Sequence, residues 1–309
     1  MENIVLYDWL SITSKIHSPQ DIVTLLGMES VSWSITKGAH GYRSRYYFNC
    51  ISIHFDGRED MGVWLEMSGQ GCRCFEDIGH GDYDFLLKLA LDNPDQMKIT
   101  RLDVAYDDHS GVLDLDEIIR DTLHENFVAK ANVWEVIQGS KGNSVVIGSR
   151  QSAVLIRIYD KARERNIKDG SHWIRVELQM RDDRCKEFVK LPFGVGESFV
   201  GVLLNYLRYV VPDEDDTNKW RWPLTDYWAN LVSDSSGISI YTKPGMEYNV
   251  LRCEDYVFNH AGNAISALLQ IHDIETFLQK LNERKCRPNP KYTNMIEQHK
   301  AIVGNYELL

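Results

Sequence analysis

Apolar and polar residues alternate along much of the first 190 positions, and three segments show the pattern most clearly. These are 99–108, 154–161 and 172–181. A β-strand presents every second side chain to the same face, so this alternation predicts strands with one face buried in a core. In all three segments the opposite face is dense in charge.

The remaining pattern within residues 1–190 predicts further strands and short helices. Residues 18–28 have the best helix start, because Ser18 can act as the N-cap and Pro19 suits the first helical position. Glycine-rich residues 69–71 are interpreted as a turn. The other expected strands are 4–13, 43–56, 62–69 and 143–149, and the other expected helices are 82–92 and 113–126.

From Gly194 onward the pattern becomes mainly helical. Residues 197–210, 254–273 and 274–285 are expected to form helices. Strands followed by helices indicate an α+β protein. We therefore expect a sheet-based domain at 1–190 and a mainly helical C-terminal region at 191–309.

The charged faces of the three clearest strands carry an unusual set of side chains. A solvated antiparallel sheet would also alternate, but its polar face usually mixes Thr, Ser, Lys and Gln. Here the faces hold three kinds of group: carboxylates, cations and one phenol. The residues are Asp103, Asp107, Glu177, Arg101, Arg157, Arg175, Lys161 and Tyr159.

If those strands are neighbours, the set suits phosphoryl transfer. Carboxylates are the ligands that Mg²⁺ or Mn²⁺ prefers, and the arginine fork matches phosphate oxygens. The phenol of Tyr159 would be the nucleophile, although at neutral pH it needs a nearby cation to favour the phenolate. Structural salt bridges and a packed tyrosine remain the alternative interpretation.

Composition and charge narrow the class of protein. The net charge of −11 argues against a general nucleic-acid coat. Its distribution is uneven: residues 76–126 carry 14 acidic and four basic side chains, whereas residues 141–184 carry ten basic and six acidic ones. This suits an anion bound in one groove with a divalent cation beside it. With no signal peptide and no apolar run of membrane-spanning length, we expect a cytoplasmic protein with reduced cysteines.

Five motifs, in order, resemble the Rep_trans replication initiation factor family. They are DWLSIT (8–13), MSGQGCR (67–73), ITRLDVAYDD (99–108), IGSRQSAVLIRIYDKARER (147–165) and WIRVELQMR (173–181). The family comprises rolling-circle initiators of Gram-positive plasmids and phages, and relaxases of some conjugative elements. The resemblance implies an antiparallel-sheet nuclease core distantly similar to the histidine-metal nickases. No His-hydrophobe-His motif is present, so carboxylates must carry the metal.

The resemblance also implies site- and strand-specific DNA cleavage that leaves the tyrosine linked to a 5′ phosphate. The roles divide into three groups. The catalytic residues would be Tyr159, Lys161 and Arg157. The metal ligands for Mg²⁺ or Mn²⁺ would be Asp103, Glu177 and, with less support, Asp107. The DNA phosphates would be bound by Arg101, Arg175 and Arg150.

The expected partner is DNA, at a replication or transfer origin with a single-stranded or hairpin nick site. A host helicase is the expected protein partner, and a homodimer is left open. The shared chemistry does not separate a replication initiator from a conjugative relaxase. Two rivals remain at this stage: a sequence-specific DNA-binding protein of the same fold without cleavage, and a metal-dependent nuclease that hydrolyses DNA without a covalent step.

Overall fold

A computed structural model describes residues 2–140, 142–236, 257 and 262–283. Contacts divide the chain into two units, Met1–Lys243 and Pro244–Leu309. The domain boundary expected between residues 190 and 191 lies inside the first unit, where the helices that follow it pack on the sheet. The second unit contributes a pair of helices, α10 (Gly262–Ile271) and α11 (Ile274–Glu283), to the described residues.

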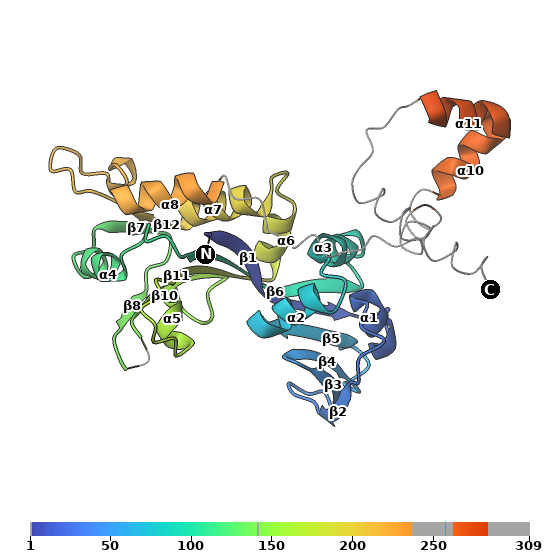
Figure 1. Ribbon diagram of the computed structural model, residues 1–309, viewed down its shortest axis with the longest axis horizontal. Helices are drawn as coiled ribbons and strands as arrows, with labels where there is room; N and C mark the ends of the chain where they lie inside the picture. Colours follow the sequence, from blue (N-terminus) through green and yellow to red (C-terminus); the bar gives the residue numbers. More distant parts are fainter. Residues whose placement is uncertain (1, 141, 237–256, 258–261, 284–309) are drawn as a thin grey trace. The chain divides into compact units, whose positions relative to one another are not determined.

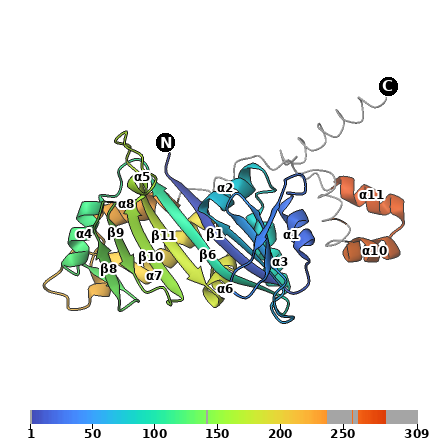
Figure 2. The ribbon, with the colours of Figure 1, turned by 90° about the horizontal axis from the view of Figure 1, so that it is seen from below.

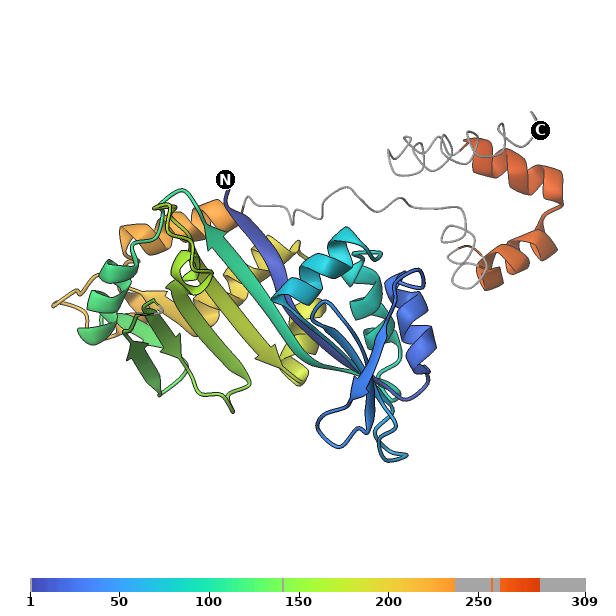
Figure 3. The same cartoon turned by 60° about the horizontal axis from the view of Figure 1, so that its bottom comes forward.

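The first unit is built on one ten-stranded sheet in the order β2-β3-β4-β5-β1-β6-β11-β10-β9-β8. Every pairing in it is antiparallel. Its strands are β1 (Ile4–Ser14), β2 (Ser34–Lys37), β3 (Ser44–Phe48), β4 (Ile51–Phe55), β5 (Val63–Ser68), β6 (Met97–Asp108), β8 (Trp134–Ile137), β9 (Ser144–Ile147), β10 (Val154–Asp160) and β11 (Ile174–Arg181). The long strands β1 and β6 join the two halves of the sheet (Figure 3).

Helices and a small two-stranded sheet complete the unit. The helices are α1 (Pro19–Leu26), α2 (Gly69–Asp77), α3 (Tyr83–Asp92), α4 (Leu115–Leu123), α5 (Lys161–Glu164), α6 (Asp183–Val189), α7 (Val195–Tyr206) and α8 (Asp226–Ser236), with a 3-10 turn at Lys219–Arg221. Strands β7 (Phe127–Ala129) and β12 (Leu207–Tyr209) pair with each other. No helix among the described residues combines the length and apolarity that crossing a bilayer would require.

The core lies on one face of the ten-stranded sheet. On that face the registers align apolar residues across the strands: Leu10 with Leu102, Leu102 with Met180, and Met180 with Val154. All four are buried, and the helices pack over them. Figure 2 shows β8, β9, β10, β11, β6 and β1 side by side with α7 and α8 behind them, and Figure 1 shows those helices along the sheet from the side. The opposite face of these strands carries the polar residues.

The α+β class and the principal strands and helices predicted from the sequence are confirmed. Helix α1 begins as expected, because Ser18 and Asp21 form a reciprocal capping box. Three predictions were wrong in detail. Residues 43–56, expected as one strand, form the two paired strands β3 and β4. Residues 69–71 form the first turn of α2 instead of a loop turn, and the helix expected to reach residue 210 ends at Tyr206, since 207–209 pair with β7. Of the expected helix 254–273, the part before residue 262 lies outside the described residues, apart from residue 257.

Candidate active site

The three charged strand faces meet at the centre of the sheet, because β11 lies between β6 and β10. The register sets Arg157 opposite Glu177 and Tyr159 opposite Arg175. On the other edge of β11, Arg175 stands opposite Asp107. Side chains that are up to 70 positions apart in the sequence therefore share one surface.

The phenol of Tyr159 lies between an acid and a base. Its side chain is 3% exposed, and its hydroxyl donates a hydrogen bond to Glu177 Oε2 at 3.1 Å. Lys161 Nζ donates to the same phenol oxygen at 3.2 Å. Lys161 is also buried and pairs with Glu164 at 2.5 Å. The oxygen is thus arranged to lose its proton toward Glu177 while an ammonium group faces its lone pair.

The surroundings of Tyr159 keep the phenol protonated in the structure as it stands. Burial raises the pKa of Tyr159 well above its usual value, and the negative charge of Glu177 raises it further. Arg175 acts in the opposite direction. The guanidinium of Arg157 lies 4.0 Å from the centre of the Tyr159 ring, a cation–π contact that fixes the ring. Added positive charge near the phenol oxygen would be needed to favour the phenolate.

Asp103 is held by Arg101 on the same strand. Arg101 Nε donates to Asp103 Oδ1 at 2.9 Å and Arg101 Nη2 donates to Oδ2 at 2.5 Å, while the guanidinium stacks 3.9 Å from the Trp9 ring centre. Burial raises the pKa of Asp103 to about 7, against the effect of Arg101. The carboxylates of Glu177 and Asp8 add to the increase. Three acidic groups therefore share one electrostatic environment beside the tyrosine.

Asp8 is a site residue that the sequence prediction missed. The register between β1 and β6 shifts between Tyr7 and Trp9, so Asp8 occupies a β-bulge and has no partner in that ladder. Its Oδ1 forms an ion pair with Arg175 Nη1 at 2.7 Å. The motif DWLSIT begins at this aspartate, but alternation alone does not reveal a bulge.

Arg175 is enclosed by carboxylates. Its Nε and Nη2 each donate to Asp107 at 2.6 Å, in addition to the contact with Asp8. Both Arg175 and Asp107 are buried. A buried arginine paired with two carboxylates can support the surrounding strands. It connects β1, β6 and β11 beside Tyr159, its partner across the β10–β11 ladder.

A cavity of about 540 Å³ opens over this cluster. The start of α2 forms one side, and a side chain at Gly69 would stand 2.7 Å from Asp8 Oδ1. The cavity is lined by Asp8, Trp9, Cys50, Ser68, Gly69, Gln70, Arg101, Asp103, Arg157, Tyr159, Lys161, Glu164, Arg165 and Glu177. Six of the nine predicted site residues are among them.

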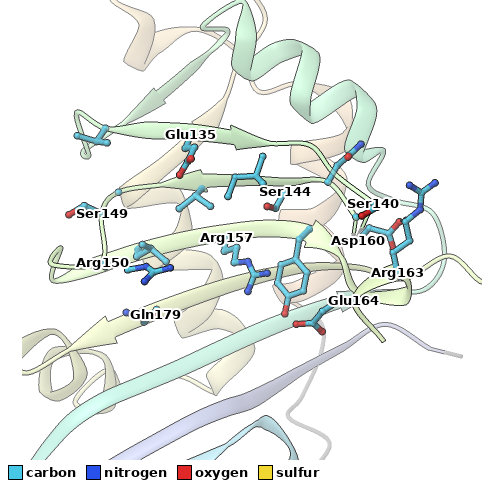
Figure 4. A pocket seen from close by; sticks show the side chains of 18 of the residues that line it. Glu135, Ser140, Ser144, Ser149, Arg150, Arg157, Asp160, Arg163, Glu164 and Gln179 are labelled. Atoms are coloured by element: carbon cyan, nitrogen blue, oxygen red, sulfur yellow. The ribbon is translucent and has the colours of Figure 1, made fainter. Parts of the chain in front are cut away.

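The remaining three predicted residues lie elsewhere. Arg175 and Asp107 form the buried pair beneath the cavity. Arg150 lines a second, larger groove over β8, β9 and β10, shown in Figure 4. That groove has a volume of about 1010 Å³ and shares Arg157, Tyr159 and Glu164 with the cavity.

The residues around the cavity suit a hard divalent cation. Asp8, Asp103 and Glu177 offer oxygen donors, which Mg²⁺ and Mn²⁺ prefer. The pKa of Asp103 is raised mainly by burial and further by the negative charges of Glu177 and Asp8, which a cation would offset. Within the described residues, no three acidic, histidine or cysteine side chains already stand together as a ready set of ligands.

Fold and site define a class: an antiparallel-sheet protein with a buried tyrosine among carboxylates and cations. Comparison with known proteins gives the family. The model of the replication initiation factor family matches residues 97–281, and that of the rolling circle replication initiation protein N-terminal domain matches residues 4–86. The chain belongs to the replication initiation factor family.

Two relatives illustrate the family. The chain is 24% identical over 270 residues to a Bacillus subtilis (strain 168) protein described as "Putative DNA relaxase NicK", covering 79% of this chain and 75% of that protein. It is similar to the structure of a rolling circle replication initiator protein from Geobacillus stearothermophilus, with 26% identity and a TM-score of 0.71. That similarity covers 78% of this chain and 99% of the other.

Proposed function

We propose that the chain is a site- and strand-specific DNA nicking–joining enzyme that cuts through Tyr159. Membership of the replication initiation factor family, a relaxase relative and a solved rolling-circle initiator support the activity. The observation that carries the residue assignment is the phenol held between Glu177 and Lys161 at 3.1 and 3.2 Å. The chemistry is transesterification: one phosphodiester bond is exchanged for another, so the cut can later be resealed.

In the first step the Tyr159 oxygen attacks the scissile phosphorus. The phenol proton passes to Glu177, which already accepts the hydrogen bond. The bond from phosphorus to the 3′ oxygen breaks, and that oxygen leaves as a 3′ hydroxyl after taking up a proton. The product is a 5′ phosphate linked to Tyr159. Attack by a 3′ hydroxyl on this linkage reverses the step and joins the DNA.

The cations around Tyr159 would neutralise charge that builds on the phosphate. Lys161 contacts the phenol oxygen directly and stabilises the phenolate as the proton leaves. Arg157 faces the ring and both cavities, where its donors can reach phosphate oxygens. Arg101 is committed to Asp103 through two of its nitrogens, so its contact with DNA would use the third.

We assign Asp103 and Glu177 as ligands of Mg²⁺ or Mn²⁺, with Asp8 as a third oxygen donor. When bound, the divalent cation would polarise the scissile phosphate and favour the phenolate. Asp107 and Arg175 receive a positioning role instead of the metal and phosphate contacts expected from the sequence, because each already satisfies the other's charge in the buried pair. Their part would be to hold Asp8 in place.

The biological setting follows the family. The DNA target would be a replication or transfer origin, which sets the expected site of action in the cytoplasm. Unwinding beyond the nick needs a helicase supplied by the host, and a homodimer would allow two chains to act on one origin. Initiation of rolling-circle replication and initiation of conjugative transfer use the same bond exchange.

A test uses supercoiled DNA that carries the gene for this chain and its flanking sequence, with Mg²⁺ or Mn²⁺ present. The expected result is a nicked circle with protein attached to the 5′ end, detected as a protease-sensitive shift. Tyr159→Phe should form no adduct. Tyr47→Phe, on β3 of the same sheet, is the matched control and should form the adduct normally.

The rivals give different outcomes. Nicking without an adduct would identify a hydrolytic nuclease. Retarded DNA with neither nick nor adduct would identify a binding protein without cleavage. An adduct formed by Tyr159→Phe would move the nucleophile to another residue.

A further inference from the structure

The groove over β8, β9 and β10, here called the β9 groove, is larger than the cavity that holds the proposed metal ligands. Its floor is the open face of those strands, one end is formed by Ser140, Gly142 and Asn143, and the other end by the loop at 148–150. Figure 4 shows Arg150 and Ser149 at one end, Ser140, Asp160 and Arg163 at the other, and Arg157 and Ser144 between them. The proposed catalytic roles use only Tyr159 and Arg157 of this groove.

The floor of the β9 groove differs from the rest of the open face. Apolar side chains project into it, among them Val133 and Ile137 of the β8 region, which are 57% and 45% exposed. Val146 of β9 and Leu155 of β10 continue this apolar floor. Apolar surface left open on a sheet indicates a ligand with flat or apolar parts.

The groove also offers cations for a charged backbone. Among the described residues, neither Arg150 nor Arg157 forms an ion pair with a carboxylate. By contrast, Asp160 and Glu164 are already engaged by Arg163 and Lys161. An apolar floor edged by available guanidinium groups suits single-stranded nucleic acid, whose bases pack on the floor while its phosphates meet the arginines.

The geometry of Tyr159 decides which part of the DNA strand lies in the groove. The phenol oxygen points from β10 toward Glu177 on β11. In an in-line displacement the leaving 3′ oxygen lies on the far side of the phosphorus from the attacking oxygen. The departing DNA therefore lies toward Asp103 and Arg101, over the 540 Å³ cavity. The nucleotides that stay attached to Tyr159 have the β9 groove beside them.

We propose that the β9 groove binds the unpaired nucleotides on the 5′-phosphate side of the nick, which remain linked to Tyr159 after cleavage. This inference rests on the proposed nicking function. Arg150 contacts a phosphate of this segment, and Ile137 packs against a base. Glu135, which also lines the groove, supplies an acceptor for a base amino group. The groove retains the covalently held DNA end while the free 3′ end is released.

The test starts from the nick site mapped with the supercoiled DNA described above. Two labelled single-stranded oligonucleotides are made: an upstream half that ends in a 3′ hydroxyl at the nick, and a downstream half that begins with the 5′ phosphate. Fluorescence anisotropy measures the binding of each half to the full chain. Arg150→Ala should weaken the downstream half about fivefold. A plot of the logarithm of the binding constant for the downstream half against the logarithm of the salt concentration should also become shallower. The slope should change by about 0.7, as expected for one lost phosphate contact on a single strand.

A second variant keeps the inference independent of one side chain. Ile137→Asp should also weaken the downstream half, and neither variant should change the upstream half. The matched controls are Arg184→Ala on α6 and Ile35→Asp on β2, both exposed and away from the groove. These controls should bind both halves as the unaltered chain does.

Several outcomes would overturn the proposal. Arg150→Ala and Ile137→Asp could leave downstream binding unchanged, weaken both halves equally, or weaken only the upstream half. Failure of the proposed function shows separately, as absence of the Tyr159 adduct on the supercoiled DNA. In that event a 5′-phosphorylated oligothymidylate replaces the downstream half. Unchanged binding of that probe to Arg150→Ala would reject the groove as a nucleic-acid site.

Discussion

The two faces of the ten-stranded sheet are made from the same strands, yet one packs in the core and the other carries the candidate active site. On the packed face, Ile156 and Ile158 of β10 are buried against apolar neighbours. On the open face, Arg157 and Tyr159 alternate with them and meet charged residues of β11. A period of two residues thus assigns one set of side chains to stability and the next to chemistry.

Burial alone does not separate the residues that stabilise the fold from those that carry the chemistry. Tyr159, Lys161, Asp103 and Arg175 are as inaccessible to solvent as many core residues. What distinguishes them is that each has a charged or hydrogen-bonding partner, which lies on a neighbouring strand for Tyr159 and Arg175. Asp103 is paired within its own strand, and Lys161 is paired with Glu164 of the same short helix. Substitutions can test this difference, because a packed-face change should lower stability while an open-face change should alter the reaction.

The sharpest test compares two adjacent residues. Tyr159→Phe removes only the phenol oxygen, so adduct formation should fall by a factor on the order of 10⁴ or more, while the thermal midpoint changes little. Ile158→Ala should lower the free energy of unfolding by about 2–4 kcal/mol. Below its melting transition Ile158→Ala should still nick DNA. Single-turnover adduct formation and thermal unfolding are measured on both variants. The comparison would be contradicted if Tyr159→Phe lost stability and Ile158→Ala lost adduct formation.

The buried Arg175–Asp107 pair should behave like the packed face although it belongs to the open one. Asp107→Asn leaves the guanidinium with less negative charge around it and should cost about 3 kcal/mol of unfolding free energy. The measurement is chemical denaturation, with Asp183→Asn as a control, since Asp183 is exposed and its carboxylate pairs with Lys186 at 3.4 Å. Equal stability of the two variants would show that the pair does not support the site.

Substitution of Glu177 should affect the rate of the reaction more than the stability of the fold. Glu177→Gln keeps the size of the side chain but removes the group that takes the phenol proton, so the rate of adduct formation should fall by about a hundredfold or more. DNA binding should not weaken, because the substitution removes a negative charge that faces the phosphate. Glu187→Gln, exposed on α6, is the matched control. An unchanged rate in Glu177→Gln would move the proton acceptor to another residue.

Alternation predicted the composition of both faces because strand geometry is local. It placed Tyr159, Arg157 and Lys161 together on one face, and likewise Arg101 and Asp103 on another. It could not give the order of strands, which sets β11 between β6 and β10. Strand order depends on long-range packing, and no local pattern reports it.

Two further features depended on interactions that the sequence does not display. Asp8 enters the site through a β-bulge, which breaks the two-residue period that makes strands recognisable. Arg175 looked available for phosphate in the sequence, but two acidic residues from β1 and β6 enclose it. The short strands β2, β7, β8 and β12 were also missed, since segments of three or four residues carry too little pattern.

The smallest effect concerns His54 of β4, a structural histidine on the open face. It is buried and stacks on Trp64 with ring centres 4.5 Å apart, and its Nδ1 accepts from the amide of Ala39 at 3.4 Å. Burial, with smaller effects of the nearby Arg45 and His40, lowers the pKa of His54 to about 4. The folded state therefore binds fewer protons than the unfolded state between pH 4 and pH 6.5.

Stability should consequently fall as the pH drops below 6.5, and His54 should account for about 2 kcal/mol of the loss by pH 5. His54→Asn places an amide oxygen near the position of Nδ1 and cannot titrate, so its unfolding free energy should depend less on pH over this range. His124→Asn is the control, because His124 is exposed and also bonds through Nδ1, to the carbonyl of Arg120 at 2.7 Å. Denaturation curves of both variants at pH 7 and pH 5 test this prediction. If His54→Asn and His124→Asn change the pH dependence equally, burial on the open face does not set the charge of His54.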